Sequence, residues 1–183
     1  MLQSDSIRLR PLSVTDIDSI MLWINDQEIN KFIARVLPLS KEAELDWLNS
    51  LTGSKTDIVF GIYHVEDENE TLIGTCGLHH IDWINRNATL GIAIGIKSYW
   101  GKKCGMRALS LLIQYAFDQL NLHRLSSSAF DENERSINLQ EKCGLVVEGR
   151  RRGAFYRHGK YYDEVLFGLL RVDYAKSLSL VTV

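Results

Sequence analysis

Helical spacing of apolar residues marks four segments of the chain. The pattern predicts a first helix that begins at Ser13, with Asp16 as its partner in a capping box, and a second that begins at Ser40. The last of the four begins near Asn133 and ends at Gly144. The third carries a single apolar stripe, formed by Leu109, Leu112, Ile113, Ala116 and Leu120.

Runs rich in β-branched and aromatic residues predict the strands. They lie at residues 6–12, 57–65, 71–81, 88–96, 124–130, 145–150 and 161–170. The polar run between the second and third strands predicts a hairpin, and the strand–helix–strand order around the third helix predicts a parallel, right-handed pair. The element order is β-α-α-β-β-β-α-β-α-β-β. We therefore expect one α/β domain over residues 1–183, with a mixed, mostly antiparallel sheet and helices on both faces.

Composition and charge narrow the function classes. The chain has 183 residues and a formal net charge of −2, with 45% hydrophobic and 24% charged residues. This balance is typical of globular proteins and gives no general attraction to nucleic acid or to membranes. The first twelve residues, MLQSDSIRLRPL, contain acid and arginine where a signal peptide would need an apolar core, so we expect a cytoplasmic protein.

Cysteine and histidine positions predict neither disulfides nor a metal site. The three cysteines are Cys76, Cys104 and Cys143, an odd number without a paired motif, which fits a reducing compartment. Cys76, His79 and His80 cluster in the sequence, but no CxxC and no matching distant pair completes a metal site.

The stretch SYWGKKCGMRAL, residues 98–109, places glycines between a strand pattern and a helix pattern. Gly101 and Gly105 remove side chains near the start of the helix, and Lys102 and Lys103 add positive charge. The first amides of a helix have no intrahelical partner and carry a partial positive charge, so this turn suits a diphosphate. An ordinary strand-to-helix turn that needs glycine for its backbone angles remains the alternative.

Several ordered motifs around this turn carry a family resemblance. They are LGIAIGIKSYWGKKCGMRAL, LNLHRLSSSAFDENERSINLQEKCGL and EGRRRGAFYRHGKYYDEVLFGLL, with IRLRPLSVTDID and IDWINRNATLGI ahead of them. Together they resemble the GNAT acyltransferase superfamily, and most of all its RimJ/RimL-type branch, over nearly the whole chain. The resemblance implies an acetyl-CoA-dependent N-acetyltransferase without a metal. It also implies that two parallel strands splay apart around the pantetheine arm.

The resemblance further implies which residues hold the cofactor. Backbone amides of the glycine turn would hold the CoA diphosphate, while the strand backbone would pair with pantetheine and stabilise the oxyanion. Lys103 stands where the family usually has glycine, so its side chain would either crowd or bind the diphosphate. A plain buried strand and a purely capping role for Asn133 remain alternatives. The predicted cofactor-binding residues are Ala93, Ile94, Gly95, Ile96, Gly101, Lys102, Lys103, Cys104, Gly105, Met106 and Asn133.

Acetyl transfer to an amine needs two proton movements. An alkyl amine with a pKa of about 10 must lose a proton before it attacks, and the departing thiolate must gain one. Ser136 and Asn133 are the predicted catalytic residues. Gln140 stands where many relatives carry a tyrosine acid, and Gly153 stands where close relatives carry a glutamate. The other candidates are the donors Cys143 and Tyr156 and the bases His79, His80, Asp82 and Glu132.

The acceptor stays open at this stage. The branch acetylates peptide N-termini, polyamines, amino sugars and similar small amines by direct attack in a ternary complex. An acidic group in the first helices could attract a cationic amine, and a basic group near the last hairpin could bind the CoA 3′-phosphate, an anionic acceptor or RNA. Both groups also suit ordinary solvated faces. The groups are Asp26, Glu28, Glu42, Glu44 and Asp46, and Arg150, Arg151, Arg152, Arg157 and Lys160.

Other classes of function remain as alternatives. A non-catalytic acyl-CoA-binding protein on the same scaffold is the main one, because Gln140 and Gly153 depart from the family pattern. A nucleic-acid binder is disfavoured by the net charge and by the lack of an RNA-binding motif. A homodimer through the edges of the last strands is left open.

Overall fold

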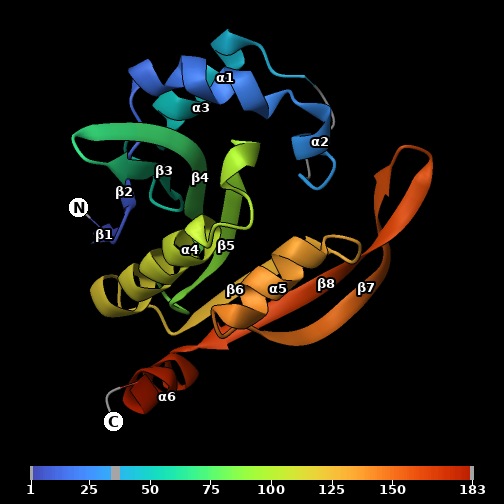
Figure 1. The fold of residues 1–183 in the computed structure, drawn as a ribbon. Helices are drawn as coiled ribbons and strands as arrows, with labels where there is room; N and C mark the ends of the chain where they lie inside the picture. Colours follow the sequence, from blue (N-terminus) through green and yellow to red (C-terminus); the bar gives the residue numbers. More distant parts are fainter. Residues whose placement is uncertain (1, 34–37, 182–183) are drawn as a thin grey trace.

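The computed structural model describes residues 2–33 and 38–181, with side chains up to residue 176 (Figure 1). Its strands form an eight-stranded sheet in the order β1-β2-β3-β4-β5-β6-β8-β7. The strands are β1 (Leu2–Ser4), β2 (Ile7–Pro11), β3 (Ile58–Glu66), β4 (Asn69–Asp82), β5 (Asn87–Ile94), β6 (Arg124–Phe130), β7 (Val146–Arg157) and β8 (Lys160–Leu170). The helical segments are η1 (Val14–Asp16), α1 (Ile17–Ile24), α2 (Gln27–Asn30), α3 (Lys41–Leu51), η2 (Lys97–Tyr99), α4 (Cys104–Gln114), the π turn η3 (Tyr115–Gln119), α5 (Glu134–Lys142) and α6 (Arg171–Val181).

The sheet is antiparallel except at its centre. There β5 and β6 pair in parallel, and only over residues 87–89 and 124–126. Beyond Thr89, β5 stays with β4 as far as the pair of Gly74 and Ile94, whereas β6 continues along β8. The expected mixed sheet with one parallel pair is confirmed, and the two parallel strands part after three residue pairs.

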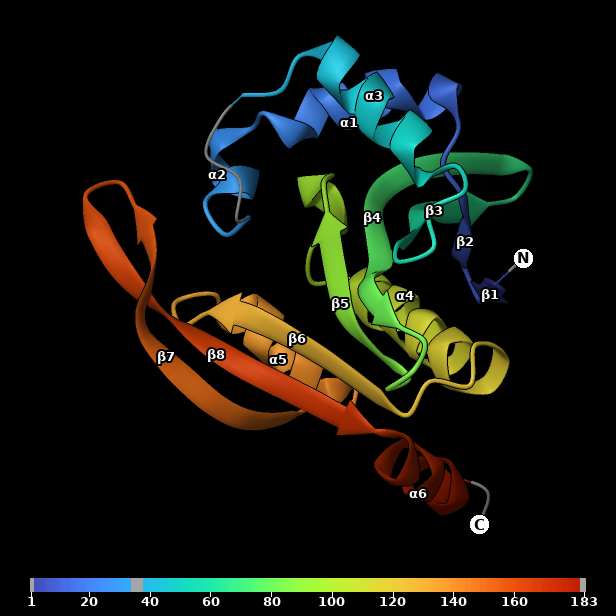
Figure 2. The same cartoon turned by 180° about the vertical axis from the view of Figure 1, so that it is seen from behind.

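Alternate residues of β3 and β4 build cores on opposite faces of the sheet. Ile62 and Ile73 belong to the main core, which includes the buried face of α4. Their neighbours Tyr63 and Leu72 join Trp23 of α1 in a second cluster. Figure 1 shows α4 and α5 in front of the sheet, and Figure 2, seen from behind, shows both helices beyond it. Helices therefore cover both faces, as expected.

A buried polar network fastens the start of α1 to β2 and β3. The Tyr63 hydroxyl donates to the Asp16 carboxylate at 2.7 Å, and the Ser13 amide donates to the same carboxylate at 2.8 Å. The Arg10 guanidinium lies 3.7 Å from the centre of the Tyr63 ring. Burial and the neighbouring carboxylate raise the pKa of Tyr63. The predicted capping box of Ser13 and Asp16 is therefore confirmed and serves tertiary packing as well.

Several elements differ from the sequence prediction. β1, α2 and α6 are absent from it, because they are short or lack a clear apolar stripe. The third predicted helix is regular only to Gln114, and the π turn that follows makes Phe117 fully buried while Leu120 is only partly buried. The predicted regular helix through Leu120 is therefore wrong. β7 runs on to Arg157, with a bulge near Gly153. Among the described residues, no helix has the length and apolar character to cross a bilayer.

Candidate functional site

Beyond the point where the two parallel strands part, β5 turns backbone groups toward β6. The Gly95 amide donates to a β4 carbonyl at 2.8 Å, whereas the Leu90 carbonyl accepts from Ser127 Oγ of β6 at 3.3 Å. Backbone groups alternate sides along a strand, so those of Ile92 and Ile94 also face β6. Since β6 has already turned toward β8, the backbone groups of Ile92 and the amide of Ile94 are available to an extended ligand.

The glycine turn brings the start of α4 to this opening. Trp100 donates its indole N–H to the Ile94 carbonyl at 2.9 Å, which ties the turn to the end of β5. Lys103 is the N-cap residue of α4 and forms no side-chain cap. A helical hydrogen bond runs from the Arg107 amide to the Lys103 carbonyl at 3.0 Å, so the helical amides before Arg107 lack intrahelical partners. They form a site suited to an anion.

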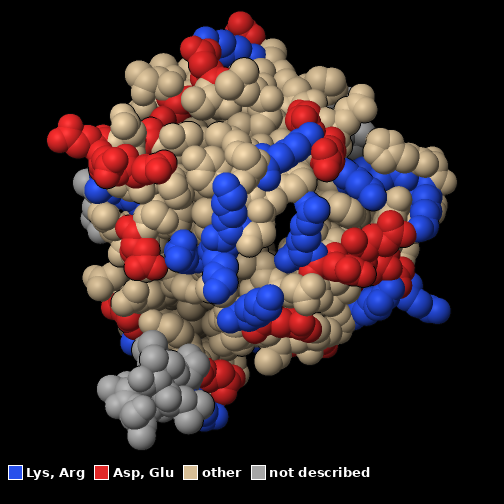
Figure 3. Space-filling view, viewed as in Figure 1, with Lys and Arg blue, Asp and Glu red and all other residues tan. Residues whose placement is uncertain are grey.

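The start of α4 is accessible and lies between β5 and α5. Lys102 and Lys103 are exposed, and Gly105 is half-buried. A Cβ built on Gly105 would lie 3.5 Å from the Leu139 side chain of α5 and 3.6 Å from the Ile94 side chain of β5. Figure 3 shows a hollow in this part of the surface, with Lys and Arg side chains on both of its sides. Positive charge and free amides therefore converge at the opening.

The αL conformation of Lys103 accounts for the family's preference for glycine at this position. Its φ is 63°, a conformation that costs an L-residue about 1–2 kcal/mol. We expect K103G to raise the free energy of unfolding by about 0.5–1 kcal/mol in urea denaturation, because glycine removes this strain but adds entropy to the unfolded chain. An unchanged or lower stability would contradict the strain. Calorimetry of the same variant with CoA shows whether the Lys103 ammonium aids or obstructs binding.

A hydrogen-bonded series begins at the N-terminus of α5, on the other side of the opening. Asn133 Oδ1 accepts from the Ser136 amide at 3.2 Å, so Asn133 is an N-cap, and Ser136 Oγ accepts from Gln140 Nε2 at 3.3 Å. Gln140 is only 3% exposed, and no group among the described residues donates a hydrogen bond to its Oε1. The Arg135 guanidinium lies 4.7 Å from the Trp100 ring centre, which joins α5 to the glycine turn.

The predicted cofactor residues on β5 and at its end point their backbone groups in different directions. By the same alternation, Ala93 and Gly95 turn their backbone groups toward β4, and the Ile96 amide donates to a β4 carbonyl at 3.2 Å. Gly95 lies under the ring of Trp23, since a Cβ there would come within 2.0 Å of the indole. Cys104 on the turn is buried, and burial raises the pKa of its thiol. Of the four predicted strand residues, only Ile94 turns its amide to the opening.

Most of the candidate acids and bases are engaged elsewhere. Asp82 accepts from the amides of its own turn, which lowers its pKa, and Glu132 pairs with Lys160. Tyr156 is 56% exposed on β7, and its ring packs at a tilt against that of Tyr161, with 5.0 Å between the ring centres. Burial raises the pKa of the Cys143 thiol, whose Sγ lies 3.9 Å from Ser110 Oγ. Of these groups, Cys143 alone contacts the start of α4 within the described part of the chain, since its thiol donates to the Met106 carbonyl at 3.8 Å.

The adjacent histidines diverge. His79 Nδ1 lies 3.0 Å from Asp57 Oδ1, whereas His80 is exposed and has a φ of 52° at a bulge of β4. Cys76, which precedes them, is buried in the main core. Within residues 2–33 and 38–176, no three His, Cys, Asp or Glu side chains come together as metal ligands would.

The basic group on the last hairpin is largely neutralised. Arg150 pairs with Asp131 and with Asp163, both at 2.6 Å, and Arg151 pairs with Glu164 at 3.1 Å. Lys160 pairs with Glu132, so ion pairs among the described residues compensate three of the five basic side chains of this group. A general electrostatic attraction for RNA is therefore not favoured.

One member of the acidic group, Asp26, lines a hollow of about 730 Å³ between α1, α2 and the end of β5. Asp26 and Glu70 line this hollow together with the Trp23 ring. Lys97 pairs with Asp26 at 3.0 Å and with Glu28 at 2.7 Å, and Glu70 pairs with Arg8 and with Arg10. The negative charge at this hollow is therefore already compensated. Gly95, the residue after β5, also lines this hollow, so the hollow adjoins the candidate site there.

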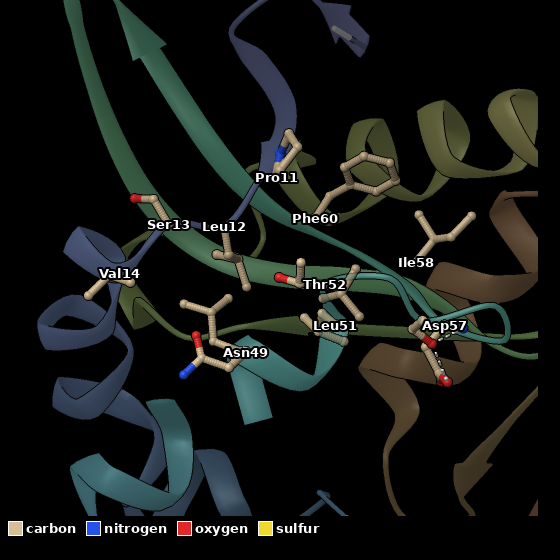
Figure 4. A pocket seen from close by; sticks show the side chains of 13 residues that line it. Pro11, Leu12, Ser13, Val14, Asn49, Leu51, Thr52, Asp57, Ile58 and Phe60 are labelled. Atoms are coloured by element: carbon tan, nitrogen blue, oxygen red, sulfur yellow. Dashed lines mark hydrogen bonds between the residues drawn. The ribbon is translucent and has the colours of Figure 1, made fainter. Parts of the chain in front are cut away.

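A second hollow, of about 430 Å³, lies between the start of α1, the end of α3 and the start of β3 (Figure 4). Pro11, Val14, Asn49 and Phe60 line it, and Asp57 lies at its edge. None of the predicted cofactor residues belongs to its lining, so it is separate from the anion site at α4.

Comparisons with known proteins agree with this geometry. Residues 6–146 match the family model described as an acetyltransferase (GNAT) domain. An uncharacterized N-acetyltransferase, p20, of Bacillus licheniformis is 29% identical over 178 residues, which cover 95% of this chain and 98% of that protein. Spermidine N(1)-acetyltransferase of Escherichia coli K12 is 26% identical over 183 residues, at 95% and 91% coverage. The crystal structure of spermidine N-acetyltransferase from Vibrio cholerae with CoA and spermine superposes with a TM-score of 0.87, at 25% identity, and covers 94% of this chain and 99% of that one.

Sequence reasoning missed three residues that shape the opening. Strict alternation along the strand could have selected Ile92 in place of Ala93. The aromatic residue before the glycine turn, Trp100, gave a signal that was not used. Trp23 gave none, because its contact with Gly95 joins segments far apart in the chain.

Proposed function

The chain belongs to the GNAT acetyltransferase family, and on this premise we propose that it transfers an acetyl group from acetyl-CoA to the primary amine of a small cationic acceptor. The single observation that carries the proposal is the uncapped start of α4 beside the parted strands β5 and β6. It combines an anion site with a free strand edge, which are the two features that a diphosphate-linked pantetheine requires.

The residues present fit such a carrier. The amides of Cys104, Gly105 and Met106 would hold the diphosphate, with Lys102 and Lys103 adding charge. The backbone of Ile92 and the amide of Ile94 would pair with the pantetheine amides as an added strand would. An amide on this edge would also stabilise the oxyanion that forms when an amine attacks the thioester.

Acid–base chemistry is the part in which this chain departs from its relatives. Gln140 cannot supply a titratable proton to the leaving thiolate, and its side chain is buried against Ser136. We propose that Asn133 and Ser136 order the α5 side of the opening around the thioester. Proximity and oxyanion stabilisation would then supply much of the rate, and the thiolate would take its proton from the attacking nitrogen.

Polyamines are the acceptor class with the most support. Two of the relatives described above are spermidine acetyltransferases, and one of them was crystallised with CoA and spermine. In this chain, Asp26 and Glu70 line a hollow that reaches the end of β5. Both carboxylates already pair with cationic side chains, so a cationic amine would bind here by displacing Lys97 from Asp26 or the two arginines from Glu70. We also predict that the chain belongs to the RimJ/RimL-type branch, that it is cytoplasmic, and that it can form a homodimer through the edge strand β7.

The proposal is tested by measuring free thiol after mixing the protein with acetyl-CoA and each of three probes. The probes are spermidine, a peptide with a free N-terminus and glucosamine, and mass spectrometry identifies any acetylated product. We expect thiol release above the rate of thioester hydrolysis with spermidine, together with acetylspermidine. Transfer to the peptide or to glucosamine alone would contradict the polyamine assignment. CoA binding without any acetylated product would favour the non-catalytic alternative.

A further inference from the structure

A histidine and an aspartate form a hydrogen-bonded pair near the opening. His79 Nδ1 lies 3.0 Å from Asp57 Oδ1, and Asp57 Oδ2 accepts from Thr56 Oγ1 at 2.8 Å and from Ser54 Oγ at 3.4 Å. An ionised carboxylate can only accept hydrogen bonds, so Nδ1 carries the imidazole proton and donates to Asp57 Oδ1. His79 Nε2 then keeps its lone pair and can accept a proton.

Two facing glycines make room for this imidazole on the sheet. Gly77 of β4 and Gly91 of β5 are paired in register. A Cβ on Gly77 would lie 3.1 Å from His79 Nε2, and a Cβ on Gly91 would lie 3.2 Å from the same atom. Among the described residues no hydrogen bond engages Nε2, and the side chain is 35% exposed. The basic nitrogen therefore lies over β5 without a protein partner.

The pair borders the opening from the face opposite to α4. His79 is in register with Thr89, the last residue of β5 that pairs with β6, and Gly91 lies just beyond, where the strands have parted. The adjacent Leu78 is fully buried in the core that includes α4, so His79 points to the other face. With the carrier held at the start of α4, an amine would reach the thioester from the His79 side.

We propose that His79 accepts the proton that the acceptor amine loses before attack, and that Asp57 is a positioning residue that fixes the imidazole. This inference rests on the proposed function, since it assigns the base of that reaction. The Asp–His arrangement follows the logic by which a carboxylate orients a histidine base in other enzymes.

The proton balance of the step is simple. The ammonium form of the acceptor gives one proton to Nε2, directly or through one water, which leaves a neutral amine and an imidazolium. The amine nitrogen forms a bond to the thioester carbonyl carbon, and the carbon–sulfur bond then breaks. The second proton passes from that nitrogen to the departing sulfur. The products are the amide, the free thiol of CoA and the imidazolium, which returns its proton to water.

The surroundings keep Asp57 ionised. Burial alone would raise its pKa, but hydrogen bonds from Thr56 and His79, with the positive charge that His79 and His80 can carry, hold the pKa below its ordinary value. His80 is thus the other titratable group that acts on the pair. It is exposed, which makes it a matched control on the same strand.

The test compares H79Q, D57N and the control H80Q, with acetyl-CoA and spermidine or whichever probe the wild-type protein acetylates. We expect H79Q to lower kcat/KM by about 10²–10³-fold and D57N by at least about tenfold, while H80Q stays within about twofold of wild type. Calorimetric affinity for CoA should stay unchanged in all three. Because a general base acts only in its unprotonated form, kcat/KM of the wild type should fall at acid pH, and H79Q should lose this limb while H80Q keeps it. Imidazole added to H79A should restore part of the rate.

The outcomes separate this inference from the function on which it rests. A wild-type protein that transfers acetyl, with H79Q equally active or with its acid limb unchanged, would overturn the role of His79 and leave the acetyltransferase proposal standing. Loss of CoA affinity in H79Q would also overturn it, because the residue would then serve binding or folding. A wild-type protein that acetylates none of the probes would overturn the proposed function and this inference together.

Discussion

G105E is expected to weaken CoA binding by at least about 100-fold while the protein remains folded. Gly105 lies in the first turn of α4, between the side chains of Leu139 and Ile94. A carboxylate at this position would occupy the free amides and repel the diphosphate, and opposed like charges cost several kcal/mol. A 100-fold loss corresponds to about 2.7 kcal/mol of binding free energy. Calorimetric titration with CoA measures it directly.

The control for this experiment is G105A. Its Cβ would make ordinary contacts at 3.5 and 3.6 Å, and alanine favours a helix, so both folding and binding should persist. Circular dichroism and thermal unfolding establish that each variant is folded. A G105E protein that is folded and binds CoA as tightly as wild type would place the diphosphate elsewhere and remove the main support for the proposed function.

G74A is expected to lower the free energy of unfolding by about 3 kcal/mol, near the upper end for overpacking a closely packed site. A Cβ on Gly74 would lie 2.1 Å from the Ala93 carbonyl oxygen and 2.9 Å from the Ile94 Cα. Both atoms are backbone of β5, so no side-chain rotation can relieve the collision. β5 would have to move away from β4. In a chain of this length the melting temperature should fall by roughly 6–12 °C.

G149A provides the matched control for G74A, because Gly149 also lies in a strand. A Cβ there would lie 3.9 Å from the Leu166 side chain, so the free energy of unfolding should change by less than about 0.5 kcal/mol. Urea denaturation of both variants measures the difference. Equal stabilities of G74A and G149A would mean that β4 and β5 are not packed as closely as the structure has them.

The fold was largely predictable from the sequence because its signals are local. The helix caps at Ser13, Ser40 and Asn133 are confirmed, since each depends on residues within three positions along the chain. The π turn after Gln114 was not predictable in this way. It depends on how Phe117 and Tyr115 pack against distant segments, and the apolar spacing alone is compatible with a regular helix.

The candidate site was predictable only in part, for a related reason. The glycine turn is a contiguous motif, so its place at the start of α4 could be deduced. The direction of each backbone amide on β5 depends on the register in which β5 pairs with β4. This register turns the amides of Ile92 and Ile94 toward the opening and those of Ala93 and Gly95 toward β4. The contact between His79 and Asp57 spans 22 residues, so no local pattern indicates it.

The brief pairing of β5 with β6 also bears on how the molecule responds to force. The strand pairing of β5 with β6 comprises three residue pairs in the described part of the chain, whereas β3 and β4 share nine. The amides of His123 and Arg124 add main-chain hydrogen bonds to the Arg86 carbonyl at the same end, and side chains of the main core also pack across this line. Under mechanical load, the part of the sheet formed by β1 to β5 should therefore rotate as a rigid unit relative to the part formed by β6 to β8, with residues 87–89 as the hinge. A molecule bound to both parts would restrict this rotation.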